Sequence, residues 1–467
     1  MPANAPFFHL IGIFREVLVM NEYIEKVIET VKRRDGDKPE FIQCVEEVFG
    51  SLESVIDAHP EYVEKDILGR MVEPDRAISF RVTWVDDAGQ TQVNRGYRVQ
   101  FNSAIGPYKG GLRFQANVTP SVMYFLGFEQ TFKNSLTGLP MGGAKGGSDF
   151  DPAGKSDAEI MRFCQAFMTE LYRHIGPDVD VPAGDMGVGG REIGYLFGQY
   201  KRIKNAFENG VFTGKGLSYG GSLIRPEATG YGAIYYVNEV LSHFGDDIKG
   251  KEFIVSGFGN VAWGAVSKIA QLGAKAVTLS GPDGYIYDPD GIVTEEKINY
   301  MLEMRASGKN TVKQYADKFG VAFFPGEKPW GVKADIALPC ATQNEVRLED
   351  AKKIVANGLK YYIEVANMPT TADALKYLAD NGLTVAPSKA VNAGGVCTSG
   401  LEMSQNSMRL AWSAEEVDEK LHNAMRTIYK NSVEAAEKYG FGYNLVAGAN
   451  IAGFLKVADA MMAQGIY

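Results

Sequence analysis

The sequence has few cysteines and histidines, and neither kind is spaced for a metal site or a disulfide frame. Its four cysteines, Cys44, Cys164, Cys340 and Cys397, are scattered without any C-x-x-C spacing. None of the five histidines forms a ligand pair. This pattern predicts reduced thiols in a cytoplasmic protein without a bound metal.

Positive charge is not in excess, and we find no apolar run of membrane-spanning length. The formal net charge is −9, which argues against a nucleic-acid partner because such proteins carry a basic face. No membrane partner is expected either. Residues 1–19 are apolar, but they lack a basic start and a small-residue cleavage site, so we do not interpret them as a signal peptide. We treat them as an extension of unknown role.

The length of 467 residues exceeds one ordinary core and predicts two or three α/β domains. Residues 21–58 have helical apolar spacing, and "ISFRVTW" and "GYRVQF" around "DDAG" predict a β-hairpin. "SDAE" at 156–159 is typical of a helix capping box, and the apolar spacing of the helix that follows places Cys164 in the core. From about residue 220, strands alternate with helices, which indicates a parallel, doubly wound sheet over 220–442. Residues 443–467 are predicted to be helical.

The segment "LPMGGAKGGSDFDP", residues 139–152, surrounds Lys145 with four glycines. One interpretation is a flexible loop whose lysine faces water. A phosphate-binding loop is a second, but the spacing G-x-x-x-x-G-K-[ST] is absent. A third is a reactive amine beside which a substrate approaches the backbone closely. This segment alone does not decide among them.

"SGFGNVAWGA" places Gly257-x-Gly259-x-x-Ala262 between a predicted strand and a predicted helix. In that setting the pattern indicates a dinucleotide site, because the glycines permit a tight turn and close approach of a pyrophosphate to the helix N-terminus. The next predicted strand ends "LSGPDG", where Asp283 lies slightly beyond the usual ribose-binding acid. No lysine or arginine follows directly, so NAD is favoured over NADP, although Arg305 or Lys309 could fold back toward a 2′-phosphate.

Several longer motifs together resemble glutamate dehydrogenase of the small hexameric bacterial type. They are "GYRVQFNSAIGPYKGGLRF", "LPMGGAKGGSDFDP", "DVPAGDMGVGGREIG", "RPEATGYG", "PCATQNE", "VANMPTT" and "SKAVNAGGV". The resemblance runs from about residue 20 to the C-terminus, and the sequences of these motifs are most similar to those of clostridial NAD-linked members. It implies a substrate and assembly domain over 20–219, a Rossmann-like dinucleotide domain over 220–442, and a C-terminal helix over 443–467 that returns to the first domain. A cytoplasmic homohexamer is expected.

The resemblance implies reversible oxidative deamination of L-glutamate to 2-oxoglutarate and ammonia. Lys145 would activate water and Asp185 would transfer protons. Lys109, assisted by Ser399, would hold the γ-carboxylate, and Lys133 the α-carboxylate. The remaining residues implied are Gln130 and Asn392 beside the substrate, and Gly257, Gly259, Asn260, Val261, Thr229, Asn367 and Asp283 beside the cofactor.

Three other functions remain open at this point. A dehydrogenase for leucine or phenylalanine would share Lys145 and Asp185 but lack the cation at Lys109. A non-catalytic dinucleotide sensor would not need Lys145 and Asp185 together. A pyridoxal phosphate enzyme would use Lys145 as a Schiff base and would absorb visible light.

Overall fold

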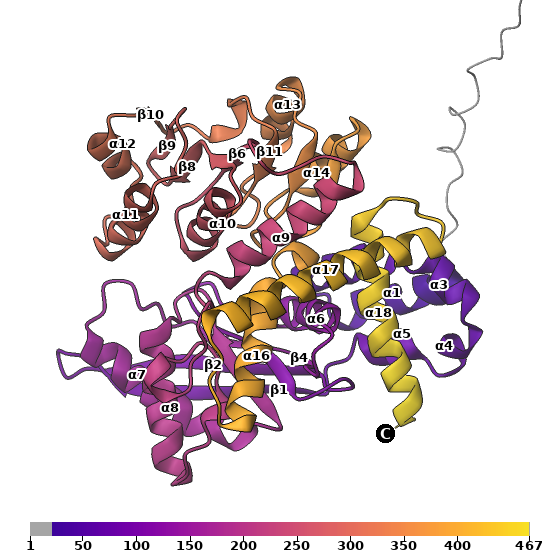
Figure 1. The fold of residues 1–467 in the computed structure, drawn as a ribbon. Coiled ribbons are helices and arrows are strands. Elements are labelled where there is room, and N and C mark those ends of the chain that lie inside the picture. The colour runs from indigo at the N-terminus through magenta and orange to yellow at the C-terminus, as the bar shows by residue number, and fades with distance from the viewer. Residues whose placement is uncertain (1–20, 467) are drawn as a thin grey trace, which may run out of the picture.

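Helices form the start of the described chain, which in this computed structural model covers residues 21–466 (Figure 1). The predicted extension of residues 1–19 lies outside the described residues. The helical stretch predicted over 21–58 is three helices, because "DGDKP" and "GSL" at 50–52 interrupt it. Its apolar repeat is confirmed as a core-facing stripe, since Phe41, Val45 and Val48 are fully buried. The helices are α1 (Glu22–Arg34), α2 (Pro39–Phe49), α3 (Glu53–Ala58), α4 (Pro60–Glu64) and α5 (Ile67–Met71).

A five-stranded mixed sheet in the order β1-β2-β4-β3-β5 organises the first domain. The predicted hairpin is confirmed, since β1 pairs antiparallel with β2. Strand β4 pairs antiparallel with β2 and parallel with β3, which in turn pairs parallel with β5. The strands are β1 (Arg76–Val85), β2 (Thr91–Asn102), β3 (Tyr108–Phe114), β4 (Gly143–Ser148) and β5 (Asp180–Gly184).

The glycine-rich segment around Lys145 is an inner strand of this sheet, so its interpretation as a loop is wrong. It forms β4, and all six of its residues are buried. Glycine is required by close packing rather than by flexibility. A Cβ on Gly110 of β3 would lie 1.6 Å from the carbonyl oxygen of Ala144, and a Cβ on Gly146 would lie 2.9 Å from the Arg98 side chain.

Helices cover both faces of the first sheet. Helix α6 (Pro120–Leu136) packs on one face in a core shared with α1 to α5, while α7 (Asp157–Leu171) and α8 (Gly190–Lys204) pack on the other. The predicted capping box is confirmed, because Ser156 and Glu159 exchange side-chain and backbone hydrogen bonds at the start of α7. Cys164 is fully buried in the core beside α8, as predicted.

The second domain is built on a five-stranded parallel sheet in the order β13-β12-β11-β6-β7, which confirms the predicted doubly wound architecture. A small antiparallel sheet, β10-β9-β8, extends beside it. The strands are β6 (Glu252–Val255), β7 (Lys275–Ala276), β8 (Thr278–Gly281), β9 (Gly284–Tyr287), β10 (Ala322–Pro325), β11 (Ile336–Leu338), β12 (Tyr361–Ile363) and β13 (Thr384–Ala386). The helices are α9 (Ala228–His243), α10 (Asn260–Gln271), α11 (Glu295–Ala306), α12 (Lys313–Phe319), α13 (Leu348–Ala356) and α14 (Ala372–Asp380).

The strand order reverses between β6 and β11. From β6 the chain proceeds to β7 on one side, and from β11 it proceeds to β12 and β13 on the other. The loops that leave the carboxyl ends of these two strands therefore diverge, and such a switch point is where doubly wound sheets bind ligands.

The last helices bring the chain back to the first domain (Figure 1). The sequence predicted that the chain returns to the first domain at residue 443. In the structure α16 already contacts that domain, because Glu402 Oε1 on α16 lies 2.6 Å from Nζ of Lys215 in the first domain. By length and composition α18 could cross a membrane, yet 61% of its most apolar stretch is buried, against α6 and the N-terminal helices. These helices are α15 (Ser388–Val391), α16 (Gly394–Met408), α17 (Ala414–Lys438) and α18 (Leu445–Gln464).

A buried ion pair spans the first sheet from β2 to β5. Arg98 Nε donates to Asp180 Oδ2 at 2.9 Å, and both side chains are fully buried. Arg98 also donates to the carbonyl of Gly110 at 3.1 Å. The long side chain fits because Gly146 leaves the space that a Cβ would fill.

We expect Arg98→Met to lower the free energy of unfolding by roughly 3–5 kcal/mol, because the substitution leaves the Asp180 charge buried without its partner. Urea denaturation of the full chain would measure the loss. Arg95→Met is the matched control, since Arg95 is exposed on the same strand. Equal stability of both variants would contradict this account of the sheet.

Candidate active site

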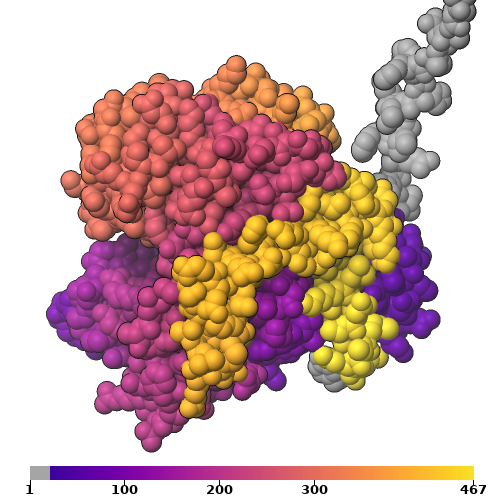
Figure 2. Space-filling view, viewed as in Figure 1, coloured from indigo at the N-terminus to yellow at the C-terminus, as the bar shows by residue number. Residues whose placement is uncertain are grey.

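Two clefts adjoin, one within the second domain and one between the two domains, where Figure 2 shows the surface hollowed. One cleft, of about 660 Å³, lies at the carboxyl ends of β6 and β11. The other, of about 570 Å³, faces the first sheet and α6. Both are lined by Val261, Cys340, Ala341 and Thr342. A ligand that fills the first cleft can therefore reach the second.

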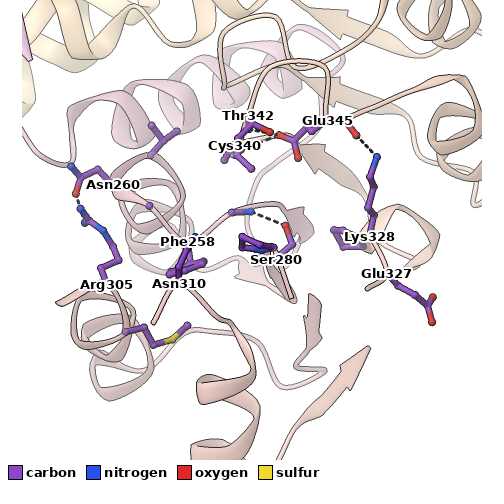
Figure 3. A pocket seen from close by; sticks show the side chains of 18 of the residues that line it. Phe258, Asn260, Ser280, Arg305, Asn310, Glu327, Lys328, Cys340, Thr342 and Glu345 are labelled. Atoms are coloured by element: carbon purple, nitrogen blue, oxygen red, sulfur yellow. Dashed lines mark hydrogen bonds between the residues drawn. The ribbon is translucent and has the colours of Figure 1, made fainter. Parts of the chain in front are cut away.

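The first cleft, shown in Figure 3, has the features of the dinucleotide site that the glycine motif predicts. Gly257 has φ +78°, a left-handed conformation that favours glycine. A Cβ on Gly259 would meet no atom within 4 Å, so this position faces open space. Helix α10 begins at the next residue, and its N-terminus presents backbone N–H groups and a partial positive charge. These features fit a pyrophosphate, and the predicted residues Gly257, Gly259, Asn260 and Val261 all line this cleft.

A single arginine lies at the same helix end. Arg305, from the last turn of α11, donates a hydrogen bond to Asn260 Oδ1 (Figure 3). The sequence left open that this cation might approach a 2′-phosphate. In the structure it lies instead beside the N-terminus of α10, where a pyrophosphate would bind.

Asp283 occupies a different position from the one expected of a cofactor contact. Its two carboxylate oxygens accept the backbone N–H groups of Val312 and Lys313, at 2.9 and 3.0 Å, at the start of α12. It is not among the residues that line either cleft. Its carboxylate therefore fixes the approach to α12 and does not face the cofactor cleft.

The loop after β11 forms the wall between the two clefts. Glu345 Oε1 accepts the N–H groups of Ala341, at 2.9 Å, and Thr342, at 3.3 Å. Burial raises the pKa of Glu345 to about 7. This carboxylate thus holds the segment that both ligands would touch.

Lys145 and Asp185 form the centre of the second cleft. Lys145 Nζ lies 2.6 Å from Asp185 Oδ2, and the same oxygen accepts from Arg113 Nε at 3.0 Å. Lys145 projects from β4, Arg113 from β3, and Asp185 directly follows β5. Gly111 leaves room for them, since a Cβ there would lie 2.9 Å from the Asp185 side chain.

The electrostatic environment sets the protonation of this pair. Burial lowers the pKa of Lys145, and the neighbouring Asp185 opposes that shift. For Asp185, burial raises the pKa, but Lys145 and Arg113 outweigh it and hold the pKa well below its usual range. One proton therefore rests on Lys145 and is shared with an ionised carboxylate. Removing either cation would make Asp185 a better proton acceptor.

Lys109 is a buried cation without a partner. It is 1% exposed, and within residues 21–466 its Nζ makes no hydrogen bond or ion pair. Burial lowers its pKa well below the ordinary value, and the nearby Arg225 and Arg98 add to this effect. Ser399 also lines the cleft and accepts a hydrogen bond from Arg225 Nε at 2.9 Å. A bound carboxylate would supply the charge that this corner lacks.

Lys133 lies at the other side of the cleft. Its Nζ is 3.5 Å from Asn367 Oδ1, which also accepts from Asn392 Nδ2 at 2.8 Å. Asn392 Oδ1 is buried without a hydrogen-bond partner in the described chain. Burial lowers the pKa of Lys133 to about 8. The predicted Gln130 and Thr229 line the same cleft.

The structure therefore brings all the predicted substrate residues together, and it adds two arginines that the sequence reasoning missed. Arg113 could have been found, because Lys109, Gly111 and Arg113 alternate along one face of a strand. Arg225 lies in the quoted motif "RPEATGYG", but no local pattern relates that loop to Ser399. Only the fold places them in contact.

Comparison with known proteins gives one consistent result. The sequence model of the glutamate/leucine/phenylalanine/valine dehydrogenases matches residues 220–465, and that of the Glu/Leu/Phe/Val dehydrogenase dimerisation domain matches residues 74–202. The chain is 70% identical over 448 residues to the NAD-specific glutamate dehydrogenase of Clostridium symbiosum, which covers 96% of this chain and 100% of that protein. It is 57% identical over 449 residues to the NADP-specific glutamate dehydrogenase of Haemophilus influenzae, covering 95% and 99%.

Solved structures agree with these matches. One glutamate dehydrogenase superimposes with a TM-score of 0.95 at 70% identity, covering 96% of this chain and 100% of its own. The glutamate dehydrogenase of Plasmodium falciparum superimposes with a TM-score of 0.93 at 52% identity, covering 95% of each chain. The predicted resemblance is confirmed over nearly the whole length.

Proposed function

The chain belongs to the glutamate/leucine/phenylalanine/valine dehydrogenase family, and we propose that it catalyses the reversible oxidative deamination of L-glutamate with NAD as the preferred acceptor. One observation carries the proposal. The cleft that holds Lys109, Lys133, Lys145 and Asp185 shares a wall with the cleft at the Gly257-x-Gly259 turn. A substrate bound at the first set of residues lies next to a cofactor bound at the second.

Glutamate fits the second cleft because it carries two carboxylates and an amino group. Lys109 Nζ has no hydrogen-bond or ion-pair partner within residues 21–466, so a γ-carboxylate would compensate its charge, and the Ser399 hydroxyl, which donates to the carbonyl of Gly395 at 3.1 Å, could turn to donate to it. Lys133 would hold the α-carboxylate. A leucine or phenylalanine side chain would leave the buried Lys109 uncompensated, which costs several kcal/mol. This cation therefore favours glutamate over the apolar amino acids.

NAD supplies a hydride acceptor when it is bound. The side chains of this protein supply the proton transfers and the orientation. Asp185, which is ionised and 2.6 Å from Lys145 Nζ, is placed to take a proton from the substrate ammonium. Lys145 would first release its own proton to solvent, which the lowered pKa from burial favours, and as a neutral amine it would then accept a proton from the water that attacks the iminium carbon. Lys109 and Lys133 hold Cα in a fixed place during both steps.

The preference for NAD is supported by the cations of the cofactor cleft. Two basic residues line it, Arg305 and Lys328. Arg305 lies against Asn260 at the α10 N-terminus, and Lys328 Nζ is 2.8 Å from Asp350 Oδ2. Neither is available beside Ser280 and Gly281, where a 2′-phosphate would need a cation. Named relatives include both NAD-specific and NADP-specific enzymes, so only an assay decides.

We also propose self-association into a homohexamer in the cytoplasm. The matched dimerisation domain supports association, and a glutamate dehydrogenase of Thermus thermophilus with 26% identity is hetero-hexameric, which supports an assembly of six chains. The four cysteines are free buried thiols, which fits a reducing compartment. Light scattering of the purified protein would test the assembly.

The assay that tests the proposed reaction compares initial rates for glutamate, leucine and phenylalanine, each with NAD and NADP. We expect turnover with glutamate, and a kcat/KM at least roughly tenfold higher for NAD than for NADP, about 1.4 kcal/mol in transition-state stabilisation. Preference for an apolar amino acid, parity between the cofactors, or visible absorbance from a bound pyridoxal group would each overturn part of the proposal.

Lys145→Ala and Asp185→Asn should each lower kcat by at least roughly 10²-fold, the usual scale for an acid–base group. Neither residue touches the cofactor cleft, so both variants should bind NADH as the wild type does. Stopped-flow turnover and NADH fluorescence titration would measure the two quantities. Near-normal turnover in either variant would remove that residue from the mechanism.

Lys109→Leu should depress glutamate kcat/KM strongly, by on the order of 10⁴-fold, because a site built to pair a buried charge discriminates steeply when the pair is broken. Some activity on norleucine or methionine should appear. Arg202→Leu, on the outer helix α8, is the control for loss of one positive charge. Unchanged specificity would show that the γ-carboxylate is held elsewhere.

A further inference from the structure

Glu129 is a buried carboxylate that the proposed reaction does not use. It lies on α6, is 7% exposed, and within residues 21–466 its side chain makes no hydrogen bond. An ionised carboxylate in such a place is costly unless cations compensate it. Two lysines, Lys133 and Lys389, act on its charge, and its place inside the protein needs an explanation.

The first of these lysines is Lys133. It follows Glu129 by four residues on the same helix, so the two side chains share a face, and the order Glu before Lys is the favourable one. Lys133 lines the substrate cleft, while Glu129 lies behind it, outside the lining. The carboxylate can thus support the ammonium without touching a substrate.

The second lysine is Lys389, on α15. It is 5% exposed, its Nζ donates to Asn450 Oδ1 at 2.6 Å, and it lies 3.7 Å from Glu47 Oε1. Burial would lower its pKa, but surrounding acids, Glu47 and Glu129 among them, raise it. Lys389 is therefore a firmly charged cation that acts on Glu129.

Burial raises the pKa of Glu129, and three nearby lysines limit that rise. These lysines are Lys389, Lys133 and Lys145, while Glu47 adds to the rise. For Lys133, burial lowers the pKa, Lys145 and Arg225 lower it further, and Glu129 and Asp185 raise it. Asp185 is already bound to Lys145 and Arg113. Glu129 is thus the carboxylate that remains for Lys133.

We propose that Glu129 is a positioning residue for the α-carboxylate subsite, the buried counter-ion that lies one helical turn from Lys133 and keeps it charged. This role rests on the proposed function of Lys133. It explains why a carboxylate is kept inside the protein at α6. It also connects the subsite to α15, whose C-cap is Asn392, a residue of the same cleft.

Glutarate binding tests the proposal, because glutarate has both carboxylates but no amino group that titrates in the same range. Calorimetry between pH 6.5 and 9.5 would follow its affinity. In the wild type, affinity should fall as pH rises through about 8, where Lys133 loses its proton. In Glu129→Gln this fall should begin about one pH unit lower, so binding should be weaker by about fivefold at pH 8 and by about tenfold at pH 9.5, the full equivalent of one pKa unit, about 1.4 kcal/mol.

Two further variants make the result specific. Glu192→Gln neutralises another buried carboxylate, on α8 and outside both clefts, and should leave the pH profile unchanged. Glu129→Asp keeps the charge but draws it back by one methylene, so it should move the profile in the same direction by less. It also provides the test if Glu129→Gln does not fold.

The outcomes separate the two proposals. Wild-type binding with an unmoved profile in both Glu129 variants would overturn the role of Glu129 and leave the proposed substrate intact. Failure of the wild type to bind glutarate would overturn the proposed substrate and this role with it. A downward shift confined to the Glu129 variants would support both.

Discussion

The close approach of β3, β4 and β5 is the constraint on which the site depends. At Gly110, Gly111 and Gly146 a Cβ would overlap a neighbouring backbone or side chain, so only glycine allows these strands to lie as they do. Their packing buries Lys109 and Lys145 and still leaves space for the buried Arg98 side chain. The four glycines around Lys145 thus serve to bury an amine rather than to make it mobile. A buried amine has a lowered pKa, and this links sheet packing directly to proton transfer.

Cations outnumber carboxylates inside the substrate cleft, and this imbalance follows from the same packing. Lys109, Lys133, Lys145, Arg113 and Arg225 line it, and Asp185 is the one carboxylate among the lining residues. Each lysine has a lowered pKa because burial disfavours its charged form. A dicarboxylate substrate reverses that penalty by supplying two negative charges. Binding should therefore raise the pKa values of Lys109 and Lys133. In the empty cleft these lysines should lose their protons more easily.

Much of this could be read from the sequence, and the exceptions have physical causes. Periodicity gave the helices, the hairpin and the parallel sheet, since it reports which face of an element is buried. The glycines around Lys145 led to the prediction of a loop in place of β4, because glycine usually marks turns. The close packing of β3 and α6 against β4, which requires these glycines, involves residues distant in sequence and has no local signal. Asp283 is turned toward α12 because its carboxylate accepts two backbone N–H groups there. Arg225 and Ser399 lie 174 residues apart in sequence, a contact that no local pattern records.

The two clefts act as one site because residues of the second domain line both of them, while the substrate cleft also takes residues from the first domain. Val261 at the start of α10 and Ala341 after β11 line both clefts, while Lys133 reaches from α6 to Asn367 across the domain junction at 3.5 Å. A shift of one domain against the other changes the Lys133–Asn367 contact and the shared wall together. Closing the cleft would therefore bring substrate and cofactor together and exclude water in the same motion, which strengthens every charge interaction inside. The buried Glu129 and Lys389 lie on the two helices that meet at this junction, α6 and α15, so their charges are placed where the domains contact each other.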